Sequence, residues 1–215
     1  MYKNKFKLFN GVYIPDIIEY LKVLINNDPY LTITVGCDSI QSKRKTVYAV
    51  TITIYNFDYR KGAHVVFFRE YLDKVKDNQE RLFNEANYVY NVGMFLDKNL
   101  SSFYNRLDLN NYQLKKYKFH LLNCNGNFLN IPNNKIDEFI KNLTLLESEH
   151  NYRLVDLHVD FNPVKGDTNE KNVLKNKSYV AYKNYVPWLR GVGFRTWVKP
   201  MAFAATSAAD LLLRK

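Results

Sequence analysis

Four acidic residues stand where their side chains could act together. Asp38 closes a short apolar segment rich in β-branched residues, LTITVGCD, and Asp160 closes a second predicted strand, in which acids and a histidine alternate with Leu and Val. Glu85 lies in a stretch with helical periodicity, and Asp210 lies in an alanine-rich stretch near the C-terminus. In an α/β fold, sites collect near the ends of central strands, so acids that are distant in sequence can converge there.

Convergence of these carboxylates would require a counter-charge. Two carboxylates about 4 Å apart repel each other by roughly 4 kcal/mol at an effective dielectric constant of about 20, so a cluster persists only when protons or cations neutralise it. Hard oxygen ligands favour Mg²⁺ or Mn²⁺, and two such ions about 3.5–4 Å apart can hold a phosphodiester and activate the attacking water. We therefore expect phosphodiester hydrolysis with two metal ions. The expected metal ligands are Asp38, Glu85, Asp160 and Asp210.

Asp38 and Glu85 also have ordinary structural interpretations. Asp38 precedes Ser39 and could form a turn at the end of its strand. Glu85 follows Arg81 by four positions, and periodicity alone favours an exposed ion pair on a helix surface. The expected place of Glu85, in the first helix after the strands, favours the site instead.

The acids of the fourth predicted strand leave a choice. Asp156, His158 and Asp160 alternate with Leu157 and Val159, so they could form the solvated face of a half-exposed strand. We favour Asp160, at the end of the strand, as the metal ligand, and Asp156 is the alternative. His158 could be a proton shuttle or a ligand, but a structural histidine fits equally well.

The C-terminal part of the chain supplies two further candidates. Asp210 shares a helical stripe with Phe203, Thr206 and Leu213, and the surrounding alanines would let this helix approach the sheet closely. A carboxylate on an inward stripe needs a partner, whereas the alternative is a solvated acid near a frayed terminus. Lys199 could contact a phosphate or pair with the acids.

The elements that carry these residues follow the order of an α/β domain with a mixed sheet. Three strands joined by short turns predict an antiparallel meander, and helices and strands alternate after it. An extra helix, with Pro15 in its first turn, precedes the first strand, and a segment without clean periodicity, 99–132, forms an insertion after the first core helix. The expected helices span 15–26, 78–98, 133–149 and 172–190, with a last one opened by Pro200, and the expected strands span 31–38, 47–55, 64–72, 152–161 and 194–199, with a short strand near 119–122.

The composition is that of a globular protein, and we expect one domain over 1–215. The chain is 47% hydrophobic and 24% charged. No uncharged apolar run reaches about 18 residues, so we expect no membrane span, and Cys37 and Cys124 lie in unlike surroundings, which favours the reducing cytoplasm, or the host cytoplasm for a phage-encoded protein. A formal net charge of +10 with 15% aromatic residues favours a nucleic-acid partner, although a solvated lysine-rich surface explains the charge equally well.

Four motifs resemble those of the YkuK-like group of ribonuclease-H-fold proteins, which are predicted nucleases. The motifs are VGCDS (Val35 to Ser39), RLFNEA (Arg81 to Ala86), DLHVDFNP (Asp156 to Pro163) and GFRTWVKPMAFAATSAAD (Gly193 to Asp210). The motifs follow one another in the same order, and the resemblance covers most of the chain outside 99–132. The resemblance implies a ribonuclease-H-like mixed five-stranded sheet flanked by helices. It also implies one site acid each from the first strand, the first core helix, the fourth strand and the last helix, here Asp38, Glu85, Asp160 and Asp210.

Two hypotheses for the function follow. The first is a Mg²⁺- or Mn²⁺-dependent nuclease that acts on RNA, DNA or a hybrid by a two-metal mechanism. The second is a non-catalytic nucleic-acid-binding or assembly protein on the same fold, for instance of a phage. In that second case the insertion would bind a protein partner or a second copy of the chain.

Overall fold

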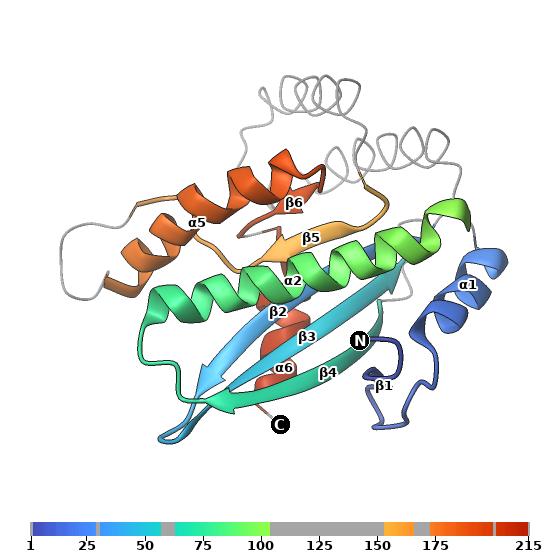
Figure 1. Cartoon of the computed structure of the whole chain (residues 1–215), viewed down its shortest axis with the longest axis horizontal. Coiled ribbons are helices and arrows are strands. Elements are labelled where there is room, and N and C mark those ends of the chain that lie inside the picture. The colour runs from blue at the N-terminus through green and yellow to red at the C-terminus, as the bar shows by residue number, and fades with distance from the viewer. Residues whose placement is uncertain are drawn as a thin grey trace, which may run out of the picture.

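The computed structural model describes residues 2–28, 31–56, 63–103, 153–165, 173–199 and 201–214. These residues form an α/β fold with a mixed six-stranded sheet in the order β1-β4-β3-β2-β5-β6 (Figure 1). The predicted insertion from 104 onward, Cys124, the strand near 119–122, the helix at 133–149 and Pro200 lie outside the described residues. The strands are β1 (Lys7–Leu8), β2 (Thr32–Gln41), β3 (Lys45–Tyr55), β4 (His64–Asp73), β5 (Asp156–Val159) and β6 (Thr196–Trp197). The helical elements are α1 (Ile17–Asn27), α2 (Asn78–Leu100), η1 (Ser101–Phe103), α5 (Val173–Gly191), the π-helical η4 (Ala204–Ala209) and α6 (Asp210–Leu213).

The meander that the sequence predicts is formed by β2, β3 and β4. β3 lies between the other two and pairs with both in antiparallel fashion. β5 then pairs with β2 in parallel, and β6 pairs with β5 in parallel. Parallel neighbours need a crossover connection, and α5 lies in the connection between β5 and β6. The expected combination of a meander with parallel strands is therefore present.

Helices cover both faces of the sheet. α2 and α5 lie side by side on one face, whereas η4 and α6 lie on the opposite face (Figure 1). α1 is amphipathic and buries Ile17, Leu21 and Ile25 in the same hydrophobic core as α2. Because both faces are covered, β3 is buried along nearly its whole length. None of the helices within the described residues has the length and apolar character needed to cross a membrane.

Gly36, in the middle of β2, lets the C-terminal segment approach the sheet closely. A Cβ atom at this position would lie 2.4 Å from the carbonyl carbon of Ala204. The hydroxyl of Thr51 donates to the carbonyl oxygen of Ala204 at 2.9 Å, and the N–H of Ala204 donates to Nδ1 of His158 at 3.2 Å. The close approach expected from the alanines is confirmed, and it also depends on the absence of a side chain on β2.

Three expectations about the elements are wrong in detail. The sheet has six strands rather than five, because the two-residue β1 pairs with the free edge of β4. The carboxylate of Asp16 accepts the N–H of Ile18 and caps α1, so Pro15 precedes the cap and does not lie in the first turn. β2 continues to Gln41 because it stays paired with β3, so Asp38 lies within the strand and not at its end.

Candidate active site

The side chains of Asp38 and Asp160 lie next to each other where β5 ends. β2 and β5 are parallel, and Cys37 opposite Val159 is their last pair. Asp38 follows Cys37 and Asp160 follows Val159, so both side chains project from the same face of the sheet. Burial, and then the negative charge of Asp160, raises the pKa of Asp38 to about 6. The two carboxylates therefore interact electrostatically.

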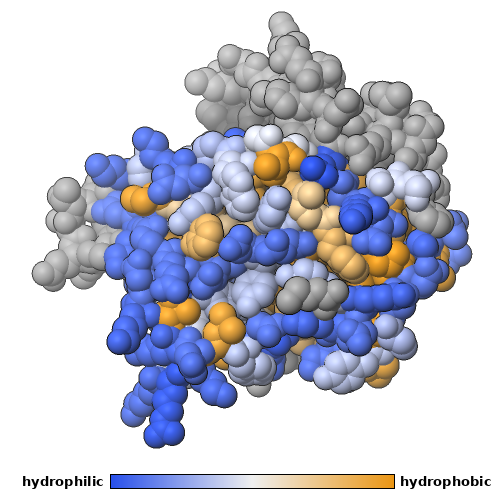
Figure 2. Space-filling view, in the orientation of Figure 1, coloured by the Kyte–Doolittle hydropathy of each residue, from blue (hydrophilic) through white to orange (hydrophobic). Residues whose placement is uncertain are grey.

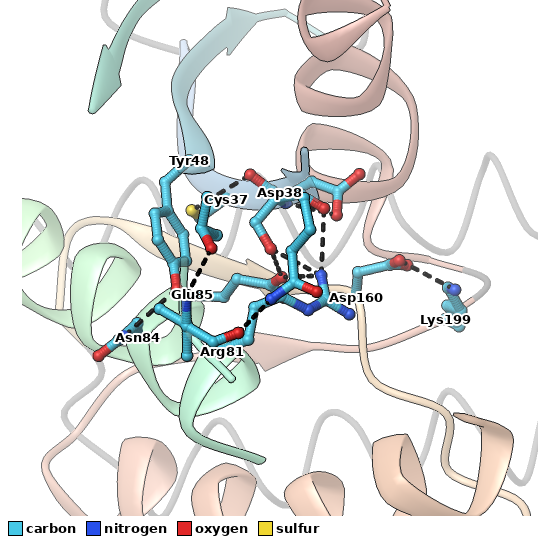
Figure 3. Close-up of polar contacts among 12 residues, drawn as sticks. Cys37, Asp38, Tyr48, Arg81, Asn84, Glu85, Asp160 and Lys199 are labelled. Carbon is cyan, nitrogen blue, oxygen red and sulfur yellow. Dashed lines mark hydrogen bonds and ion pairs between the residues drawn. The ribbon is translucent and has the colours of Figure 1, made fainter. Parts of the chain in front are cut away.

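Glu85 reaches the same place from α2. Its carboxylate accepts hydrogen bonds from the hydroxyl of Ser39 at 2.5 Å and from Arg81 at 3.1 Å (Figure 3). Burial, and then the charge of Asp38, raises the pKa of Glu85 to about 8. The ion pair with Arg81 is present, as helical spacing allows, but Glu85 is buried and the pair is not an ordinary exposed one.

Asp160 has one paired and one unpaired oxygen. Its Oδ2 forms an ion pair with Nζ of Lys199 at 2.9 Å. Its Oδ1 is buried and has no hydrogen-bond partner among the described residues. Burial raises the pKa of Asp160, and the positive charge of Lys199 opposes this rise. An unsatisfied buried oxygen costs free energy, so this atom marks a place where a cationic ligand would be stabilising.

Asp210 lies at the edge of this cluster, at the start of α6. Its charge contributes to the raised pKa values of Asp38 and Asp160. Its own carboxylate forms an ion pair at 2.8 Å with Arg214, one helical turn later. Asp210 is therefore near the other acids, but its side chain is engaged by an exposed arginine.

A cavity of about 330 Å³ opens beside the three inner carboxylates. Asp38, Glu85 and Asp160 line it together with Arg81 and Lys199 (Figure 3). The remaining lining comes from α2, from α5 and from the segment after β5, and comprises Asn78, Leu82, Asn162, Lys177 and Ser178.

The side chains of the cavity suit a hard divalent cation by their chemistry. The raised pKa values of the three carboxyl groups and the unsatisfied oxygen show that added positive charge would be stabilising. Within the described residues, however, no three His, Cys, Asp or Glu side chains are gathered closely enough to hold a metal ion. Arg81 and Lys199 supply positive charge to Glu85 and Asp160 instead. The donor types fit Mg²⁺ or Mn²⁺, while the arrangement is one of ion pairs with basic side chains.

Asp156 and His158 lie on β5 as well, but they contact protein groups and not the cavity. The carboxylate of Asp156 accepts Nε–H of Arg195 at 2.8 Å and the indole N–H of Trp197 at 2.9 Å. His158 accepts the N–H of Ala204, and burial lowers the pKa of its ring to about 3, so the ring is neutral. Neither side chain lines the cavity. Both are buried, so the interpretation of this strand face as solvated is wrong.

Ser39 and Lys177 are site residues that the sequence patterns do not single out. Ser39 bridges two acids, because its N–H donates to Asp38 at 2.7 Å and its hydroxyl donates to Glu85. Its place directly after Asp38 was the available signal. Lys177 comes from α5, and only the crossover between β5 and β6 brings that helix to the cavity.

The comparisons with known proteins identify one family. The search of curated proteins and the search of solved structures found no match. A family model described as Ribonuclease H-like matches residues 14–121, a segment that includes β2 to α2 and therefore Asp38 and Glu85. The narrower resemblance to the YkuK-like group stays a prediction. The matched segment spans half of the chain and carries the antiparallel meander of the mixed sheet, and the chain belongs to the ribonuclease H-like family.

Proposed function

We propose that this protein is a divalent-metal-dependent nuclease that hydrolyses phosphodiester bonds. The observation that carries the proposal is the convergence of Asp38, Glu85 and Asp160, from three different elements, on one cavity. Burial raises the pKa values of all three carboxyl groups, and the negative charges of neighbouring acids add to each rise, a condition that is concentrated at functional sites. Membership of the ribonuclease H-like family supports the same class of reaction.

Asp38 and Asp160 would hold Mg²⁺ or Mn²⁺, for which we expect two ions. Glu85 would assist from α2 on one face of the sheet, and Asp210 would assist from α6 on the other. When bound, the ions supply the positive charge that polarises a phosphodiester and lowers the pKa of the attacking water.

The basic side chains of the cavity suit the phosphate groups of a substrate. Arg81 uses NH1 to bind Ser39 and Glu85, whereas its Nε and NH2 make no hydrogen bond within the described residues. Arginine holds phosphate through parallel N–H donors, so Arg81 would bind a phosphate while its anchored nitrogen fixes the orientation of the group. Lys177 and Lys199 line the same cavity and add positive charge.

The test compares wild type with Asp38→Asn on RNA, DNA and RNA–DNA hybrid substrates in the presence of Mn²⁺. We expect the substitution to lower the cleavage rate by more than about 100-fold, because even the groups behind metal ligands contribute about 10- to 100-fold. Asp73→Asn removes the same charge from an exposed position at the end of β4 and should cleave like wild type. Equal cleavage by wild type and Asp38→Asn, or no cleavage by either, would contradict the proposal.

A second candidate function is favoured by the ion pairs of the site. Because Arg81 and Lys199 already pair with Glu85 and Asp160, the same fold could bind nucleic acid or serve in assembly without cleaving anything. A non-catalytic nucleic-acid-binding protein would show affinity that falls steeply with salt and no turnover at any Mn²⁺ concentration. Cleavage that disappears in Asp38→Asn excludes this candidate.

A further inference from the structure

α5 runs beside α2 in the same direction, and both helices begin near the cavity (Figure 1). At that end, the side-chain amide of Gln79 donates to the carbonyl oxygen of Lys177 at 2.9 Å. Farther along, two pairs of aromatic rings join the helices. These four rings, termed the aromatic seam, belong to Phe83, Tyr90, Tyr185 and Trp188.

The aromatic seam is only partly covered by protein. The ring centroids of Phe83 and Tyr185 are 5.3 Å apart, and those of Tyr90 and Trp188 are 4.7 Å apart. Phe83 and Trp188 nevertheless remain 39% and 37% exposed. Figure 2 shows this face of the molecule, where orange and pale side chains interrupt the blue surface over α2 and α5. Exposed apolar side chains that are grouped on one face are typical of a binding surface.

The charge on α5 decides which kind of ligand would suit this surface. Between Val173 and Gly191 the helix has no acidic residue, and its basic residues are Lys175, Lys177, Lys183 and Arg190. Lys177 lines the cavity, and the ammonium group of Lys183 lies 5.7 Å from the ring of Tyr179. Cations together with exposed rings are complementary to a polyanion that also presents flat apolar groups, which is the chemistry of a nucleic acid.

We propose that the aromatic seam binds a single-stranded polynucleotide and leads it into the cavity. The inference rests on the proposed nuclease function and adds the form of the substrate to it. Side-chain rings can stack only on bases whose faces are free, whereas the bases of a duplex are stacked on their own neighbours. Every base has such a face, so the binding tolerates different sequences. A strand lying on the seam continues past Lys177 to Arg81, which places one of its phosphates beside the carboxylates.

The test measures binding of labelled oligonucleotides by the full chain in a chelator, so that no cleavage occurs. The probes are oligo-dT and oligo-U of about 20 nucleotides, longer than the roughly 4–16 nucleotides that a strand-binding domain covers, and DNA and hybrid duplexes of equal length. Trp188→Ala and Phe83→Ala should each weaken single-strand binding by about 5- to 150-fold, the effect of losing one stacked base. Tyr71→Ala, which removes an exposed ring from β4, is the control and should bind like wild type.

A spectroscopic measurement separates stacking on the seam from a general loss of structure. The chain has two tryptophans, and the indole N–H of Trp197 is held by Asp156 away from the cavity. Stacking on Trp188 should therefore quench part of the fluorescence of wild type when oligo-dT binds. Trp188→Phe keeps a ring, so it should retain most of the affinity and lose the quench.

The outcomes distinguish this inference from the proposed function on which it rests. Duplexes that bind as tightly as single strands, unchanged affinity in both alanine variants, or no binding at all would overturn the inference. If cleavage depends on Asp38 but Trp188→Ala cleaves duplexes and single strands like wild type, the nuclease function is supported and strand binding by the aromatic seam is rejected. If single strands bind through Trp188 but nothing is cleaved, strand binding by the aromatic seam is supported and the nuclease function is rejected.

Discussion

An aspartate lies at each end of β5, Asp156 at the start and Asp160 directly after the last residue, and both side chains point to the same face of the sheet. The two carboxylates have different surroundings. Asp156 has both carboxylate oxygens occupied, one by Arg195 and one by Trp197. Asp160, four residues later, has one oxygen on the half-exposed Lys199 and one buried oxygen without a partner among the described residues. We call the Asp156 end of β5 closed, because protein groups bind both carboxylate oxygens. We call the Asp160 end open, because one oxygen has no partner among the described residues and could accept a ligand.

The difference follows from the topology of the sheet. At the Asp156 end, β5 is flanked by β2 and by the segment that forms β6, and two donors of the β6 segment, Arg195 and Trp197, reach the carboxylate. Asp160 lies beyond the last pairs of β5 with both neighbours, where a cavity opens. Residue type alone therefore does not identify a site acid; the number of protein donors that the fold supplies to it does.

The largest expected difference concerns stability, in the matched pair Asp156→Asn and Asp160→Asn. Asp156→Asn removes the carboxylate that forms a buried ion pair with Arg195, so we expect a loss of about 3–5 kcal/mol of unfolding free energy. Asp160→Asn removes a carboxylate that is incompletely paired, and its cost should stay below about 1 kcal/mol because Lys199 can turn to solvent. Urea denaturation at pH 7 measures both. Equal losses in the two variants would contradict the distinction between a closed and an open end.

A second prediction concerns Gly36, which lies opposite His158, between the two ends of β5. Gly36→Ala places a methyl group against the backbone of Ala204, so we expect a loss of about 3 kcal/mol, at the upper end of the usual cost of overpacking. Gly191→Ala is the control, because its Cβ would meet nothing within 4 Å. Thermal denaturation of the two variants should differ clearly, and equal melting temperatures would show that η4 does not hold its position against β2.

The third prediction tests the open end with Mn²⁺. An ion that binds only the folded chain raises its stability by about 2.7 kcal/mol when its concentration is about 100 times its dissociation constant. We expect such a rise in wild type and in Asp156→Asn, and its loss in Asp160→Asn, as measured by Tm with and without Mn²⁺. Retention of the full rise in Asp160→Asn would place the ion elsewhere.

The smallest effect is a pH dependence that involves Glu85. Because the folded-state pKa of Glu85 is raised to about 8, the folded chain binds more protons than the unfolded chain, and stability falls as pH rises toward and through that value. Between about pH 6.5 and 8.5 we expect wild type to lose roughly 2 kcal/mol. This window lies above the range in which buried, neutral His158 destabilises the chain on acidification.

Glu85→Gln keeps the shape of the side chain and removes the titrating group. The difference in unfolding free energy between wild type and this variant should therefore change with pH across the same window. A constant difference would show that Glu85 is already ionised at pH 6.5.

Much of the fold can be predicted from the sequence because its signals are local. The alternation of β2, β3 and β4 and the helical period of α2 place those elements within a few residues of their observed bounds. β1 could not be predicted, since two residues carry no period, and the extension of β2 past Asp38 depends on pairing with β3. The bounds of β5 and β6 are shorter than expected for the same reason, because pairing and not composition ends them.

The site is predictable only in part. The sequence by itself determined which acids exist and which elements carry them, because residue type and periodicity are properties of neighbouring residues. Only the tertiary structure decided that Asp156 is closed, that Asp160 is open, and that Gly36 admits the C-terminal segment that positions Asp210. These outcomes depend on contacts between residues far apart in the chain, such as Thr51 with Ala204. Such contacts form only when the connections between strands bring the helices against the sheet. No local sequence pattern specifies them.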